Sequence, residues 1–109
     1  MCLLHYLLFQ DWEFLQRYSA YHNIDPALTN YPALLMTTST RDDRVHPYHA
    51  RSFVKRLLEC KKGPQPIERD DKVLYYENIE GGHGGAADSK QQAFMNVLYL
   101  EFLKKELCK

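Results

Sequence analysis

One short stretch constrains the fold of this chain more than any other: a histidine between two pairs of glycines, at residues 81–85. The apolar run before it, residues 73–79, is typical of a strand, and a helical pattern follows from residue 89. Glycines accept positive φ and leave room for another group, so we expect His83 to be presented on a loop. A strand, a glycine-rich loop and a helix form half of a βαβ unit, which predicts an α/β fold.

The composition is typical of one small globular domain. The chain has 109 residues, of which 45% are hydrophobic, and 14 basic side chains balance 14 acidic ones. This balance lacks the basic footprint of a nucleic-acid-binding protein, so we expect no nucleic-acid partner. The apolar opening, residues 1–9, has no basic leader and is too short to cross a bilayer, so we expect neither a signal peptide nor a membrane anchor.

Metal and redox chemistry have little support in the sequence. The three cysteines are far apart and form no paired motif, which is typical of free thiols in a reducing, cytoplasmic compartment. His46 and His49, with Asp42 nearby, have a spacing that metal ligands can adopt, but three candidates beside a proline do not define a site. We therefore expect no metal and no cofactor.

The remaining segments predict a second strand and two further helices. A short helix is expected from Asp11, as N-cap, to Ser19. The run 33–39 lacks polar alternation and suits a strand buried on both faces. Apolar spacing predicts a helix from Pro47 to about Cys60 and a closing helix from about residue 89. The apolar stripe of the closing helix comprises Ala93, Val97, Leu100, Leu103 and Leu107, and Phe94, Leu98 and Phe102 widen it.

The two predicted strands are joined by a helix, so they should pair in parallel and end at the same edge. Asp42 and Asp43 follow the first strand and His83 follows the second, which brings a carboxylate within reach of an imidazole. Such a pair is the orienting half of a triad of nucleophile, base and carboxylate. Topology alone allows either aspartate. The alternative is a solvated charge run beside an incidental histidine.

Three segments resemble a known family. Tyr31-Pro32-Ala33-Leu34-Leu35, Arg41-Asp42-Asp43-Arg44-Val45-His46-Pro47 and Gly81-Gly82-His83-Gly84, at this separation, resemble the C-terminal end of prolyl oligopeptidase family serine peptidases. The resemblance covers about the last three quarters of the chain and extends more loosely to residues 12–23. It implies an α/β-hydrolase catalytic domain, which the family carries beside a β-propeller, and cleavage of short peptides after proline.

The resemblance also implies roles for single residues. The first aspartate of the Asp-Asp-Arg motif, Asp42, becomes the triad acid, and His83 becomes the general base. Arg44 becomes the arginine that binds a main-chain carbonyl of the substrate. In the family these residues follow the nucleophilic serine along the chain, in the order serine, aspartate, histidine.

The nucleophile itself is absent from the sequence. The family places its serine in a Gly-x-Ser-x-Gly turn, and no such motif occurs in these 109 residues. We therefore interpret residues 1–109 as one partial catalytic domain, a C-terminal piece from a split, truncated or rearranged gene. It should contain the C-terminal βαβα part of an α/β-hydrolase, with short parallel strands and flanking helices, and neither nucleophile elbow nor propeller.

Two functions remain open. In the first, the chain is the acid-base segment of a prolyl oligopeptidase-type peptidase, inactive alone and active on proline-containing peptides when a complementary chain supplies the serine and propeller. In the second, it is a non-catalytic relic or interaction module that pairs with a homologous hydrolase chain. In both, a two-stranded remnant exposes an apolar face and an unpaired edge, which predicts self-association.

Overall fold

The computed structural model describes residues 11–27, 31–60 and 73–108; the apolar opening at residues 1–9 lies outside them. The labelled elements are β1 (Leu34–Ser39), α2 (Tyr48–Cys60), β2 (Val73–Asn78) and α3 (Ser89–Leu107). The strands pair in parallel, with Leu34 opposite Val73 and Ser39 opposite Asn78. The predicted α/β fold, with parallel strands joined by a helix, is therefore confirmed.

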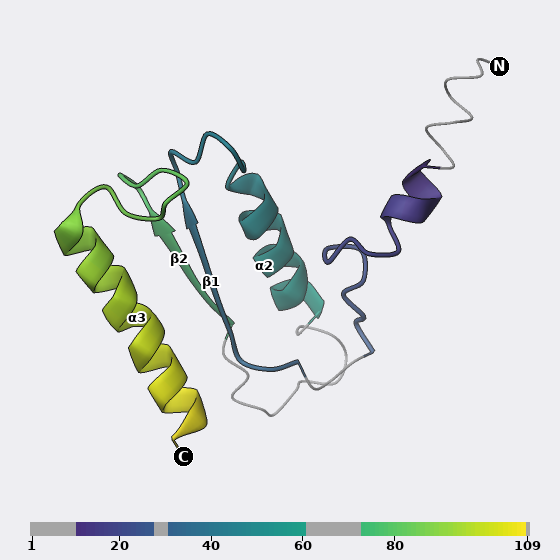
Figure 1. Cartoon of the computed structure of the whole chain (residues 1–109). Helices are drawn as coiled ribbons and strands as arrows, with labels where there is room; N and C mark the ends of the chain where they lie inside the picture. Colours follow the sequence, from purple (N-terminus) through teal and green to yellow (C-terminus); the bar gives the residue numbers. More distant parts are fainter. Residues whose placement is uncertain (1–10, 28–30, 61–72, 109) are drawn as a thin grey trace.

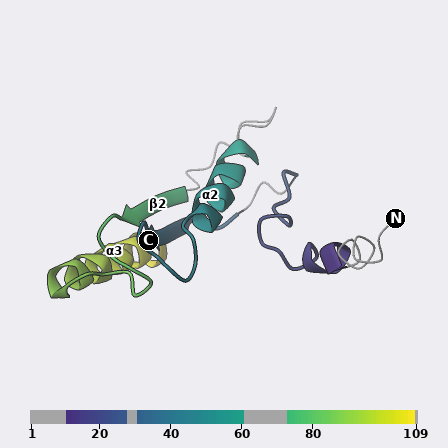
Figure 2. The ribbon, with the colours of Figure 1, turned by 90° about the horizontal axis from the view of Figure 1, so that it is seen from above.

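The two helices lie on opposite faces of the sheet, so the described fold has three layers (Figures 1 and 2). Alternate residues of β2 point to opposite faces, as the pleat of a strand requires. Glu77 bonds with Arg51 of α2 on one face. On the other face, the ring of Tyr76 packs against Phe94 of α3, with the ring centroids 5.4 Å apart.

The segment 11–27 lies on the far side of α2 from the sheet (Figures 1 and 2). The guanidinium of Arg56 in α2 lies 5.0 Å from the centre of the Tyr21 ring, which is within the range of a cation–π contact. Among the described residues, the buried hydrophobic side chains come from this segment, α2 and α3. They are Ile24, Val54, Leu57 and Met95.

The start of α2 is capped by the residues before it. The Pro47 carbonyl accepts the N–H of Arg51 at 3.0 Å, and Nδ1 of His46 accepts the N–H of Tyr48 at 3.1 Å. The side-chain bond satisfies one of the N–H groups that a helix leaves free at its first turn. The ring of His46 therefore has a structural partner at the beginning of α2.

The helix predicted from Asp11 to Ser19 ends earlier than expected. Residues 11–15 are helical, and Asp11 lies within the helix and not at its cap. The amide Nδ2 of Asn23 donates to the carbonyl oxygens of Gln16 and Ser19, both at 2.8 Å. Because these carbonyls accept bonds from a side chain, the regular hydrogen-bond pattern of the helix does not continue through the segment.

The prediction of which face of α3 is buried is wrong. Val97, Leu100 and Leu107 of the predicted stripe are 58%, 65% and 77% exposed, and its other two members are exposed as well. Met95 is buried instead, while Leu98 and Phe102, which were expected to widen the stripe, are half-buried. Apolar residues lie around most of this helix, so their spacing alone does not select the face that meets the sheet.

The burial expected for β1 is also wrong. Residues 34–38 are half-buried, and only Ser39, at the end of the strand, is buried. The described sheet has two strands, so β1 pairs on one side only, and α2 and α3 cover each face partially. An apolar run of this kind matches a strand in a larger sheet better than one in this arrangement.

Candidate active site

Asp42 shapes the loop that follows β1. Its Oδ1 accepts the N–H of Arg44 at 2.9 Å and that of Val45 at 2.8 Å. Its own N–H donates to the carbonyl of Ser39 at 3.2 Å. An aspartate side chain that accepts hydrogen bonds from the N–H groups two and three residues ahead closes a tight turn. The carboxylate is thereby fixed just past the carboxyl end of β1.

The same bonds keep Asp42 ionised. The pKa of its carboxyl is lowered from the ordinary value of 3.8, most of all by the N–H of Val45. Burial opposes this change, while the N–H of Arg44 and the ring of His83 lower the pKa further. The side chain is only 11% exposed. Asp42 is therefore a shielded carboxylate that stays charged at neutral pH.

His83 is presented on a turn of the glycine loop. The N–H of Gly85 donates to the carbonyl of Gly82 at 2.9 Å, which places His83 inside a four-residue turn. Gly85 has a φ of +83°, a conformation that favours glycine. The side chain of His83 is 45% exposed. The loop therefore holds the histidine at the surface, as its glycines predict.

The structure brings Asp42 and His83 together. Nδ1 of His83 lies 3.0 Å from Oδ1 and 3.0 Å from Oδ2 of Asp42. Because a carboxylate only accepts, Nδ1 carries the proton, which leaves Nε2 as the basic nitrogen of the neutral ring. Of the two aspartates that topology allowed, Asp42 is the partner, whereas Asp43 is exposed. The carboxylate of Asp42 can therefore hold the His83 ring in one tautomer and stabilise the imidazolium form of the ring.

Arg44, the third residue of the predicted site, lies beside this pair. Its backbone N–H bonds Asp42, and its side chain is exposed. Within the described part of the chain, its guanidinium forms no ion pair.

Two of the four serines use their hydroxyls in other hydrogen bonds. Oγ of Ser19 bonds Nδ1 of His22 at 2.8 Å, and the hydroxyl of Ser52 donates to the carbonyl of His49 at 3.1 Å. Ser39 is buried at the end of β1, and Ser89 is the first residue of α3. Across residues 11–27, 31–60 and 73–108, no serine hydroxyl bonds the ring of His83.

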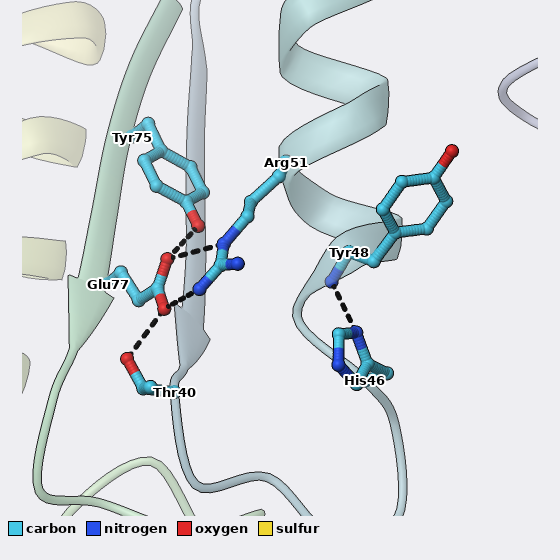
Figure 3. A network of polar contacts seen from close by, with 6 residues as sticks. All are labelled: Thr40, His46, Tyr48, Arg51, Tyr75 and Glu77. Carbon is cyan, nitrogen blue, oxygen red and sulfur yellow. Dashed lines mark hydrogen bonds and ion pairs between the residues drawn. The ribbon is translucent and has the colours of Figure 1, made fainter.

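Sequence reasoning missed a cluster of hydrogen-bond donors around the carboxylate of Glu77, next to the site (Figure 3). Glu77 of β2 accepts bonds from Nε of Arg51 at 3.0 Å, from Oγ1 of Thr40 at 2.6 Å and from the hydroxyl of Tyr75 at 2.6 Å. A second guanidinium nitrogen of Arg51 also donates, which makes the ion pair bidentate. The only signal for it in the sequence is a charged residue within an apolar strand.

This cluster shifts three pKa values. The pKa of Glu77 falls from 4.5 to about 2, mainly because Arg51 donates to it and then because Thr40 and Tyr75 donate. The carboxylate in turn raises the pKa of Arg51. The pKa of Tyr75 is raised, first by burial and then by its bond to Glu77. Because Thr40 lies two residues before Asp42, the cluster also anchors the start of the Asp42 loop.

Among the described residues, His46 and His49 belong to no cluster of potential metal ligands. His46 uses Nδ1 to accept the N–H of Tyr48 (Figure 3). In the described ranges, no group of three or more histidine, cysteine, aspartate or glutamate side chains is placed to hold a metal ion. Within the same ranges, no helix has both the length and the apolar character needed to span a bilayer.

Comparison with known proteins identifies the relatives of this chain. The uncharacterized peptidase y4nA of Sinorhizobium fredii is 42% identical over 94 residues, which cover 86% of this chain and 12% of that protein. The prolyl oligopeptidase ophP of Omphalotus olearius is 44% identical over 100 residues, covering 90% and 13%. The prolyl endopeptidase of Elizabethkingia meningoseptica is 32% identical over 96 residues, covering 88% and 13%.

The chain thus spans only 12% to 13% of the length of these three relatives. No solved structure matches it significantly. The sequence profile of the prolyl oligopeptidase family matches residues 6–109, which include the loops of Asp42 and His83. The chain therefore belongs to the prolyl oligopeptidase family of peptidases, and its parallel strands and helices are part of the α/β fold of that family's catalytic domain.

Proposed function

We propose that this chain is the acid-base segment of a prolyl oligopeptidase-type serine peptidase, with Asp42 as the triad acid and His83 as the general base. The observation that carries the proposal is the contact of Nδ1 of His83 with both oxygens of Asp42, each at 3.0 Å. In such a triad the carboxylate holds the tautomer. Nε2 then takes the proton of the serine hydroxyl and passes it to the leaving amine.

The nucleophile and the oxyanion-hole donors come from outside these 109 residues, which contain no Gly-x-Ser-x-Gly motif. Residues 1–109 therefore act as one part of a catalytic domain and are inactive alone. The substrates are short peptides cleaved after proline, in line with relatives named prolyl oligopeptidase and prolyl endopeptidase. The exposed side chain of Arg44, next to the pair, binds a main-chain carbonyl of the substrate.

A second candidate function is favoured by the exposed apolar face of α3. Val97, Leu100 and Leu107 are each more than half exposed. A helix face of this kind is typical of a surface that another protein covers. In this alternative the chain is a non-catalytic module that pairs with a homologous hydrolase chain or with a second copy of itself.

A mixing experiment separates the two functions. The chain is combined with a separately expressed upstream piece of a family member that carries the propeller and the serine elbow, and cleavage of a fluorogenic proline-containing peptide is measured. Under the first proposal, activity arises only on mixing, is lost with His83→Ala and persists with His49→Ala, which changes an exposed histidine of α2. A folded complex without activity contradicts the peptidase proposal and favours the binding module.

A further inference from the structure

We propose that Asn78 is a positioning residue for the Asp42–His83 pair. Its side-chain amide closes the glycine loop that carries His83, and its backbone carbonyl holds that loop to the one that carries Asp42. The inference rests on the proposed function in that it takes His83 to be the base. The contacts of Asn78 themselves are independent of any catalytic role.

The side chain of Asn78 bonds both ends of the glycine loop. Asn78 is the last residue of β2 and is only 5% exposed. Its Oδ1 accepts the N–H of Glu80 at 3.0 Å and that of Gly81 at 3.1 Å, where the loop begins. Its Nδ2 donates to the carbonyl of Gly85 at 2.7 Å, where the loop ends. His83 is therefore held on a loop that one buried amide closes.

Gln91, in the first turn of α3, fixes the orientation of this amide. Its Oε1 accepts the second Nδ2 proton of Asn78 at 3.0 Å and the N–H of Ala87 at 2.9 Å. Its Nε2 donates to the carboxylate of Glu80 at 2.6 Å. All four hydrogen-bonding positions of the Asn78 amide are thus occupied, and a flipped amide would face a mismatched partner at each.

The loop wraps so closely around Asn78 that only glycine fits at its start. A Cβ atom on Gly81 would lie 2.7 Å from the carbonyl oxygen of Gly85 and 2.9 Å from Nδ2 of Asn78. Contacts this short would force the backbone or the amide to move. The absence of a side chain at Gly81 therefore belongs to the same closed arrangement as the amide bonds.

The backbone of Asn78 connects this loop to that of Asp42. Its carbonyl accepts the N–H of Thr40 at 2.8 Å, which extends the strand pairing one residue beyond Ser39. The two loops also lie in contact, because a Cβ on Gly82 would sit 3.7 Å from the carbonyl oxygen of Arg41. One residue thus bonds the His83 loop through its side chain and the Asp42 loop through its carbonyl.

Replacing the amide should release His83 from Asp42 without removing either residue. In Asn78→Ala, both ends of the glycine loop lose their shared partner, so the 3.0 Å contact is no longer enforced. Misplacement of a catalytic group by about 1 Å can lower a rate by about a hundredfold. In a complemented enzyme we expect a fall of that order in kcat, with KM unchanged.

The direct readout is the tautomer of the His83 ring in the full chain, followed by NMR of the ring nitrogens. The unaltered chain should carry the proton on Nδ1, and Asn78→Ala should shift the ring in the same direction as Asp42→Asn, in which one carboxylate oxygen is replaced by a donating NH2 group. In the double variant that combines Asp42→Asn with Asn78→Ala, the second change should not alter the His83 ring any further. If Asn78 has only a structural role, Asn78→Ala should perturb the ring equally in the wild-type chain and in the Asp42→Asn chain.

The chain offers a matched control in Asn23. Its amide also organises a loop, donating to the carbonyls of Gln16, Arg17 and Ser19 at 2.8, 3.1 and 2.8 Å. Asn23→Ala therefore removes a comparable set of bonds far from His83 in the sequence, and should leave its tautomer unchanged. If Asn23→Ala alters the His83 ring as much as Asn78→Ala does, the effect is general and the proposal is overturned.

If Asn78→Ala does not fold, Gln91→Met decides the question. This change keeps the side-chain length while it removes the partner that orients the Asn78 amide, so a smaller shift in the same direction is expected. A wild-type His83 tautomer in the folded variants overturns the proposal. The NMR readout requires no hydrolysis. A shifted tautomer together with an inactive wild-type complex would therefore uphold the role of Asn78 and reject the peptidase function.

Discussion

At the scale of single residues, Asp42 performs two tasks with one carboxylate. Oδ1 bonds the N–H groups of Arg44 and Val45, while both oxygens face Nδ1 of His83. The first task builds the loop and the second holds the imidazole. A substitution that preserves the first task and removes the second can therefore distinguish loop structure from acid-base chemistry.

Asp42→Asn is that substitution. The amide oxygen can still accept from the two backbone N–H groups, but an amide cannot serve Nδ1 of His83 as a carboxylate does. In a complemented complex we expect kcat to fall by about four orders of magnitude, because the ring adopts the wrong tautomer. Steady-state cleavage of the proline peptide measures this loss. The control is Asp43→Asn, an exposed neighbour, and equal losses in both variants would refute the assignment of Asp42.

The sequence predicted the residues of the pair but not how they are held. The expected parallel pairing of the two strands placed a carboxylate near His83, because the residues that follow parallel strands lie at the same edge of the sheet. The preference for Asp42 over Asp43 came from family resemblance, because it depends on turn bonds that no periodicity reveals. Asn78 gave no signal at all, since a lone asparagine at the end of a strand is typical of any turn.

At the scale of elements, α2 is attached to the sheet by a charged cluster as well as by apolar packing. Arg51 of α2 forms a bidentate pair with Glu77 of β2 (Figure 3), and Val54 and Leu57 of the same helix are buried. Thr40, which begins the Asp42 loop, bonds the same carboxylate. The packing of α2 and the start of the Asp42 loop therefore depend on a common ionised group.

This dependence predicts a pH effect on stability. The pKa of Glu77 in the folded chain is about 2, below its ordinary value of 4.5. Its stabilising contribution is thus complete above pH 4.5 and is lost as the pH falls toward 2. Glu77→Gln should lower the urea midpoint at neutral pH, and the difference from wild type should shrink across that acid range. Circular dichroism at a series of pH values measures it.

The matched control for this experiment is Glu59→Gln. Glu59 lies on α2 and pairs with Lys55 at 3.8 Å, with both side chains mostly exposed. An exposed pair of this kind contributes little to stability. A pH-independent difference between Glu77→Gln and wild type, or an equal effect of Glu59→Gln, would contradict the role given to the cluster.

Element order followed from local signals, whereas the packing of the elements did not. The expected strand at 33–39 is Leu34–Ser39, and the expected start of α3 near Ser89 is set by Asp88, whose side chain accepts the N–H of Gln91. The prediction of the buried face of α3 was wrong because Met95 and the exposed Leu100 have equally apolar neighbours on the helix. Which of these faces meets the sheet is decided by tertiary contacts such as that of Phe94 with Tyr76.

At the scale of the whole molecule, the described residues bury few hydrophobic side chains, while α3 leaves several large apolar side chains exposed. β1 and β2 pair with each other alone in the described sheet, so each has an unpaired edge. Uncovered apolar surface and free strand edges both favour association with other chains.

We therefore predict that the chain self-associates. Light scattering coupled to size exclusion should give a mass above the 12.9 kDa of one chain, rising with concentration. Leu100→Glu places a charge on the exposed face of α3 and should shift the chain toward the monomer. Gln92→Glu adds the same charge at an exposed polar position of α3 and should have no effect. A clean monomer at high concentration would argue against this prediction.

The central claim is that His83, oriented by Asp42, activates a serine that lies outside these 109 residues. The most direct measurement is the rate at which a fluorophosphonate labels that serine in the mixed complex, because this reaction reports activation of the hydroxyl without peptide specificity. We predict faster labelling with the wild-type chain and with His49→Ala than with His83→Ala. Equal labelling rates with wild type and His83→Ala would contradict the claim.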